Sequence, residues 1–357
     1  MRVIVLIIFT FGLVWGQSLR ERQGAYSLVE HLRGELRLGY IDSFSSAFGA
    51  EGHFHARTGR FRGWCLGGTL EGVARLDGEH PEFFPKSGLF ATLSEIFVSY
   101  KGPRAALKAG RIMVEYTPHL DSDDIRLFPN YFRGLHFTME LSDALAHLLF
   151  VDRMAGWESG EPIDSFKNLG RVLGLDEDIA GVAVAGISGL GYEAWLYHIA
   201  EVGQILYLDH TFLGEHWSAG IQADLVQGRG VMELESRTIG LFGQWEMRNV
   251  RLYASANKEF GSGAAPSFGG GPLYTSMELL TLDLFGADAA AWTAGAEIDL
   301  WRTCFGAMYG RFWGEGSDDE LDLYFHRRLG YGFGYDVLYG ERKGGENIFR
   351  AIVRYGF

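Results

Sequence analysis

The sequence has little of what marks a helical membrane protein or a disulfide-stapled one. Its longest apolar run, Val3–Trp15, is shorter than the roughly 20 apolar residues that a membrane-spanning helix needs. Only 8 prolines and 2 cysteines occur in 357 residues. Cys65 and Cys304 fall on separate expected strands, so they do not indicate a disulfide framework.

Glycine and aromatic residues are abundant instead. The chain has 50 glycines and 14% aromatic residues, and no segment shows clear helical periodicity. This composition favours many β-strands. The formal net charge of −13 makes a nucleic acid an improbable partner.

The N-terminus has the pattern of an export signal. Arg2 is a positive start, residues 3–14 form an apolar stretch, and the small residue Gly16 precedes Gln17 at a suitable cleavage site. We therefore predict a signal peptide at residues 1–16. It would direct export of the protein and leave a mature chain of residues 17–357. A buried first strand and an uncleaved anchor are the alternatives.

The mature chain predicts about eighteen strands with alternating side-chain patterns. In the first, Leu36 and Leu38 share one face, while Arg33, Glu35 and Arg37 share the other. The expected strands cover residues 32–41, 52–61, 64–76, 92–100, 105–114, 132–141, 145–156, 179–188, 192–200, 204–212, 217–227, 238–248, 250–260, 292–300, 303–313, 319–329, 331–341 and 346–357.

The connections between these strands alternate in length. Those at even positions are only a few residues long, whereas those at odd positions vary and include the long segments 157–178 and 261–291. Antiparallel strands with short turns at one rim and longer loops at the other are typical of a membrane β-barrel. An even strand number places both termini on the periplasmic side. A soluble β-propeller is the alternative, but no blade-length repeat is present.

The strand faces predict lipid outside the barrel and water inside it. In residues 217–227, Ile221 and Leu225 lie on an apolar face opposite Gln222 and Asp224. A barrel of sixteen to eighteen strands is wide enough for an aqueous channel. The expected fold is therefore all-β, a single transmembrane antiparallel barrel formed by residues 17–357.

The last strand ends on an aromatic residue. Val353, Tyr355 and Phe357 occupy every second position and share the outward face of this strand. This ending resembles the signal by which outer-membrane barrels are recognised for insertion, so we expect the barrel-assembly machinery as a partner.

The segment Gly110–Gly134 links two strands through a polar loop stiffened by Pro118 and Pro129. We expect it to fold into the barrel and form a constriction. Its charged candidates are Asp121, Asp123, Asp124 and Arg126. The acids could oppose a basic wall, form a solvated loop tip or bind a divalent cation, although their order lacks the spacing of a calcium loop.

These motifs resemble the OprD-type porins of Gram-negative bacteria. The matching residues are Leu36-x-x-Gly39-Tyr40, Gly67-Gly68-x-Leu70, Leu107-Lys108-Ala109-Gly110-Arg111, Thr117-Pro118, Asp124-x-Arg126-Leu127-x-Pro129 and Phe132-x-Gly134. The resemblance implies a largely monomeric, eighteen-stranded channel for small solutes, often carboxylates. It also implies inward-folded third and seventh loops and a ladder of basic residues on one wall.

Strand parity can be used to test for that ladder. Arg33 and Arg37 on the first strand and Arg350 and Arg354 on the last have inward parity, and these strands must pair to close the barrel. Arg328 and Lys108 share that parity. Arg111 is out of phase with Lys108, so its place in the ladder rests on the resemblance alone. The alternative is that these residues only neutralise acids of the wall, such as Glu35.

The predicted function is an outer-membrane porin for small hydrophilic solutes, favouring small anions such as carboxylates. The alternative is a barrel enzyme, a phospholipase or protease, for which no persuasive catalytic group is found. His53 and His55 lack an evident third ligand, so we expect neither a metal nor a cofactor. Outer-membrane lipid and lipopolysaccharide are the expected surroundings, the latter through acidic loops and bridging cations.

Overall fold

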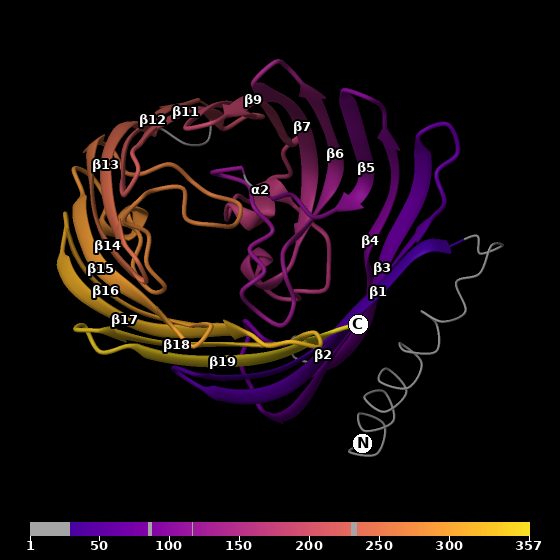
Figure 1. Cartoon of the computed structure of the whole chain (residues 1–357). Helices are drawn as coiled ribbons and strands as arrows, with labels where there is room; N and C mark the ends of the chain where they lie inside the picture. Colours follow the sequence, from indigo (N-terminus) through magenta and orange to yellow (C-terminus); the bar gives the residue numbers. More distant parts are fainter. Residues whose placement is uncertain (1–28, 85–87, 116, 230–233) are drawn as a thin grey trace.

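The strands of the chain form a closed ring (Figure 1). A computed structural model describes residues 29–84, 88–115, 117–229 and 234–357. Within these residues, nineteen strands make one sheet. One of them, β8, has only two residues, so eighteen long antiparallel strands build the wall. The signal peptide expected at residues 1–16 lies outside the described residues.

The bounds follow the chain in order. The strands are β1 Val29–Asp42, β2 Ser46–Thr58, β3 Trp64–Gly78, β4 Leu89–Lys101, β5 Ala105–Ile112, β6 Tyr131–Glu140, β7 Ala144–Ala155, β8 Lys167–Asn168, β9 Val182–Gly189, β10 Tyr192–Ile199, β11 Gly203–Leu213, β12 Trp217–Gly228, β13 Glu235–Met247, β14 Val250–Gly261, β15 Ala290–Leu300, β16 Thr303–Trp313, β17 Ser317–Arg328, β18 Phe333–Arg342 and β19 Asn347–Gly356. The helical turns are η1 Trp157–Ser159, α2 Leu169–Val172 and η2 Leu282–Phe285. No helix in the described part of the chain is long and apolar enough to cross a membrane.

The first and last long strands pair and close the barrel, as expected from the sequence. Strand β1 pairs with β19 in an antiparallel register that sets Arg37 opposite Arg354 and Leu38 opposite Val353. On its other side β1 pairs with β2. No edge strand remains between them, so the backbone groups at this seam are bonded as a membrane barrel requires.

The strand bounds match the predicted ones closely, with one marked difference in β2. This strand begins at Ser46 rather than Gly52, so the first loop is only residues 43–45. Residues 46–51 include Gly49 and two alanines, which have low strand propensity. Pairing with β1 decides their conformation, with Ala47 opposite Ile41 and Ala50 opposite Leu38.

The two faces of the wall have opposite chemistry. Large apolar side chains are exposed on the outside, and polar side chains are buried on the inside. On β12, Ile221 and Leu225 are exposed while Gln222 and Asp224 are buried. The same holds on β13, where Leu241 is exposed and Thr238 is buried. This is the expected arrangement of a barrel with hydrocarbon outside and a polar lumen inside.

Loops fill part of the lumen. The third loop (residues 113–130) and the seventh loop (residues 262–289) lie inside the ring in Figure 1. Their apolar side chains, among them Leu120, Leu127, Phe268 and Leu280, are buried against the inner wall. The seventh loop contains the short helical turn η2.

Candidate functional site: a loop-narrowed pore

The third loop is fixed to the inner wall by packing at a glycine. Leu127 is fully buried, and a Cβ at Gly39 of β1 would lie 2.8 Å from its side chain. Only glycine therefore lets the loop approach the wall this closely. Phe83 of the second loop (residues 79–88) packs at the same place.

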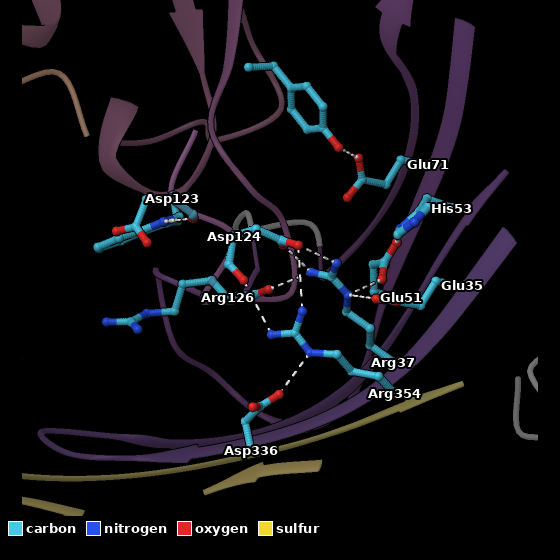
Figure 2. Close-up of polar contacts among 12 residues, drawn as sticks. Glu35, Arg37, Glu51, His53, Glu71, Asp123, Asp124, Arg126, Asp336 and Arg354 are labelled. Carbon is cyan, nitrogen blue, oxygen red and sulfur yellow. Dashed lines mark hydrogen bonds and ion pairs between the residues drawn. The ribbon is translucent and has the colours of Figure 1, made fainter. Parts of the chain in front are cut away.

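One carboxylate of the third loop binds both arginines of the barrel seam. Both carboxylate oxygens of Asp124 accept hydrogen bonds from Arg37, one over 2.8 Å. Arg354 lies 3.5 Å from the same carboxylate and donates to the Asp124 backbone oxygen over 3.3 Å. Figure 2 shows both arginines pointing from the wall toward this loop. The seam arginines therefore hold the constriction in place.

Arg37 is surrounded by acids and is not open to solutes. Its Nε lies 2.6 Å from Glu35 and 3.4 Å from the fully buried side chain of Glu51. The Arg37 side chain is only 3% exposed. The carboxylates of Asp124, Glu35 and Glu51 thus compensate the charge of the Arg37 guanidinium. This arrangement fits the alternative reading of the sequence, in which the arginines neutralise acids of the wall.

Arg126 of the third loop contacts residues of three other loops. Its Nε donates to Glu82 of the second loop over 2.6 Å, and its Nη2 lies 3.0 Å from Glu278 of the seventh loop. The guanidinium also stacks 4.4 Å from the ring centre of Trp157. Although burial alone would lower it, the acids Glu278 and Glu82 raise the pKa of Arg126 above its usual value. The residue is a structural hub, with 4% of its side chain exposed.

The third and seventh loops pair through their backbones. Leu120 and Phe268 form an isolated parallel bridge. The Asp121 N–H donates to the Phe268 oxygen over 3.3 Å, and the Phe268 N–H donates to the His119 oxygen over 2.9 Å. Gly269 follows with φ +95°, and a Cβ there would lie 2.1 Å from the Asp121 oxygen. The two loops therefore behave as one unit across the lumen.

The seventh loop is tied to the barrel wall along its length. Gln222 of β12 donates to the Pro272 oxygen over 2.6 Å. Glu320 of β17 accepts from the backbone N–H groups of Leu279 and Leu280 over 2.8 and 2.7 Å. Arg350 of β19 binds Glu278. The bonds from Gln222 and Glu320 satisfy loop backbone groups that would otherwise be buried without partners.

Two acids of the constriction are held in dry surroundings. Burial raises the pKa of Asp123 to about 6, opposed by Arg126. Burial and the nearby Asp123 raise the pKa of Glu158 on η1 to about 8. Glu158 accepts a hydrogen bond from Asn130 over 2.5 Å. Below about pH 6 both carboxyl groups hold a proton, whereas at neutral pH Asp123 is ionised and Glu158 is not. The charged opposing wall of Asp121, Asp123 and Asp124 stays a prediction.

The remaining ladder candidates divide into engaged and open residues. Lys108 faces the lumen and donates to Glu95 over 2.6 Å. Among the described residues, Arg33 and Arg328 have no ion-pair partner. Both line lumen cavities, Arg33 one of about 390 Å³ near β1 to β3 and Arg328 one of about 620 Å³ near β16 to β19.

The assignment of Arg111 to the pore ladder is wrong. Its register partners, Ile96 on β4 and Arg133 on β6, both have outward, exposed side chains. The Arg111 guanidinium donates to the Leu93 oxygen over 3.0 Å and lies over the ring of Phe166. No bulge reverses its direction between Lys108 and Arg111, so parity prevails over the motif.

Several residues of the site were missed from the sequence. Glu278, Glu82 and Glu158 bind the third loop from loops distant in the chain. Their sequence neighbourhoods show only an acid in a polar connection. The signal that could have found them is the acid excess of these loops beside one arginine, Arg126.

The histidine pair and the C-terminal aromatics take ordinary places. His53 bonds Glu51 over 3.0 Å and His55 bonds Thr69 over 3.0 Å. In the part of the chain that the structure describes, no cluster of three or more metal-ligating side chains occurs. Phe357 packs on Phe54, and Tyr355 packs on Phe357. Both cysteines are free and buried.

Known proteins resemble this chain in structure and not in sequence. No family model and no curated protein matches it. The outer membrane protein OpdK from Pseudomonas aeruginosa superposes with a TM-score of 0.78 at 16% identity, over 93% of this chain and 100% of that chain. OccAB2 from Acinetobacter baumannii gives 0.79 at 14% identity, over 93% and 99%. OpdK has also been crystallised with vanillate. The chain therefore shares the fold of these barrels.

Proposed function

We propose that this protein is an outer-membrane porin of the OprD type, which lets small hydrophilic solutes diffuse through a loop-narrowed lumen. The observation that supports this most is the paired third and seventh loop inside a polar-lined ring, joined at Leu120 and Phe268. The lumen of such a ring excludes lipid and large molecules. Its selectivity among solutes follows from the width of the lumen and the charges that line it. The fold shared with OpdK, an outer membrane protein, supports the same proposal.

The favoured solutes are small anions, carboxylates in particular. Arg33 is open in one cavity, and Arg302, Arg328 and Arg354 line the other together with Asp299 and Asp336. Arginine keeps its charge and offers a planar fork to carboxylates. The crystallised OpdK complex contains vanillate, an aromatic carboxylate, which supports the same solute class.

Ion preference tests the role of the open arginines. The reversal potential is measured in a salt gradient across a planar bilayer for the parent and for Arg33→Gln with Arg328→Gln. We expect the variant to lose anion preference while its conductance stays similar, because neither residue binds a loop. Arg237→Gln, on the outer face, is the matched control. An unchanged reversal potential in the double variant would remove these residues from selectivity.

Liposome swelling tests the function itself. Proteoliposomes are challenged with carboxylates, sugars and amino acids of increasing size. Entry of small solutes without lipid or peptide hydrolysis supports the channel, whereas hydrolysis without entry supports the enzyme alternative.

The proposal includes export and assembly. Residues 1–16 would direct export, and Tyr355 with Phe357 would present the terminal insertion signal to the barrel-assembly machinery. The mature barrel would act as a monomer in the outer membrane. Phe357→Ala tests the signal, because a lower yield of outer-membrane protein is expected without a change in conductance per channel.

A further inference from the structure

Three arginines lie side by side on adjacent strands near the loop end of the barrel. Arg111 of β5 is the register partner of Arg133 of β6. Arg133 is in turn the register partner of Arg153 of β7. Like charges directly opposite one another on a sheet destabilise it. A row of three therefore requires compensation from other charges.

The row lies on the outer face. Arg133 has 48% of its side chain exposed. On the same strands, one step farther from the loops, the outward side chains are apolar, with Leu135 and Phe150 exposed and paired to each other. Arg111 and Arg133 each lie within three residues of the third loop. On β6 and β7 the row therefore lies beyond the exposed apolar side chains, on the side of the long loops, while on β4 exposed apolar side chains such as Leu93 reach farther toward the loops.

Compensation within the protein is incomplete. Arg133 makes a two-bond pair with Asp152, one bond being 2.8 Å long. Arg111 uses one donor for the Leu93 oxygen, and Arg153 uses one for the Phe166 oxygen, 3.2 Å away. The acids of the adjoining loop, Glu161 and Asp164, interact with Lys167. Among the described residues, the three guanidinium groups thus share one carboxylate, that of Asp152, and each guanidinium has five donors.

Phe166 contacts Arg111 and Arg153, the two ends of the row. Its ring lies under the Arg111 guanidinium, 4.6 Å from ring centre to Cζ, and its backbone oxygen accepts from Arg153. This fixes both guanidinium groups at the rim beside Arg133. A preorganised set of donors binds an anion with less loss of conformational entropy.

We propose that Arg111, Arg133 and Arg153 form a binding site for the phosphate groups of lipopolysaccharide in the outer leaflet. Arginine binds phosphate through paired, charge-assisted hydrogen bonds. The exposed apolar side chains below the row would contact the acyl chains of the same molecule. A solute phosphate would instead bind within the lumen, where Lys108 points. This direct contact differs from a cation bridge to acidic loops, because no metal ion is needed.

Binding of lipid A to the purified full-length barrel in detergent tests the proposal. Bis-phosphorylated and dephosphorylated lipid A are titrated in the presence of EDTA, which removes bridging cations. We expect the phosphorylated form to bind, and the triple variant Arg111→Gln, Arg133→Gln, Arg153→Gln to bind roughly tenfold more weakly or worse. Arg237→Gln is the matched control, since Arg237 is an exposed outward arginine between Leu225 and Phe260 on neighbouring strands.

The outcomes separate clearly. Equal binding of both lipid A forms, or unchanged binding by the triple variant, would overturn the proposal. A second variant, Arg153→Lys, keeps the charge and tests the fork geometry, and an intermediate affinity supports direct phosphate contact. Far-ultraviolet circular dichroism shows that each variant is folded. Unchanged conductance separates loss of this site from failure of the channel.

Discussion

Arg37 and Arg354 face each other across the strand pair that closes the barrel, and both contact the carboxylate of Asp124 in the third loop. The closure of the wall and the position of the constriction therefore depend on the same charges. A solute passing the seam meets a wall in which the central arginine is already neutralised. The seam positions the loop, whereas Arg33 and Arg328 have no ion-pair partner among the described residues and line cavities of the lumen.

Loss of Arg37 should release the third loop. In Arg37→Gln, Asp124 loses its two-bond partner and the buried Glu51 loses its arginine partner. An uncompensated buried charge costs about 3 to 5 kcal/mol. We expect larger, noisier single-channel conductance and a lower unfolding temperature. Arg33→Gln is the control, and equal conductance in Arg37→Gln and the parent would contradict the loop-holding role.

Arg126 should not be replaceable by lysine. Lysine keeps the charge but has no fork that reaches Glu82 and Glu278 together and stacks on Trp157. We expect Arg126→Lys to raise conductance and to make the second and seventh loops more sensitive to protease. Arg62→Lys, in the short turn before β3, is the matched control. Parent-like protease resistance of Arg126→Lys would argue against the hub.

Gly269 should be required for pairing of the two inner loops. Alanine at φ +95° is strained, and its Cβ would lie 2.1 Å from the Asp121 oxygen. We expect Gly269→Ala to separate Leu120 from Phe268 and to widen the pore. Larger sugars should then enter liposomes. Gly316→Ala serves as control, because a Cβ at Gly316 meets no atom within 4 Å.

The constriction should loosen as the pH rises. The pKa of Glu158 is about 8 in the structure against an ordinary 4.5, mainly because of burial. Between these values an exposed Glu158 is ionised while the packed one holds a proton, so loop packing loses stability as pH increases. Asp123, with a pKa of about 6, acts in the same direction at lower pH.

Conductance from pH 5 to pH 9 measures this effect. We expect it to rise with pH in the parent and to be nearly flat above pH 7 in Glu158→Gln. The amide keeps the size of the side chain and never ionises. A parent-like rise in Glu158→Gln would assign the pH response to other groups.

Most of the wall was predictable because the alternation of apolar and polar residues in each strand gives the direction of its side chains. Alternation on residues 217–227 gives the outward Ile221 and the inward Gln222 without knowledge of any neighbour. Parity and barrel closure also predicted that inward arginines of the first and last strands lie at one seam. The register that sets Arg37 opposite Arg354 came from the structure. The one false ladder residue, Arg111, came from a motif that parity contradicted.

The partners of the loops could not be predicted in the same way. Glu278 meets Arg126 across more than a hundred residues, and no periodicity marks either one. Acidic residues in connections look alike whether they are solvated or buried. Only their surroundings distinguish Asp124, which binds the seam, from Glu158, which is buried next to Asp123.

The sequence by itself determined the barrel, because side-chain alternation and connection length are local properties that each strand carries. The tertiary structure alone decided which lumen charges remain open. Whether an arginine meets a solute or a carboxylate depends on where distant loops fold, and folding brings Asp124 to Arg37 while leaving Arg33 without an ion-pair partner among the described residues.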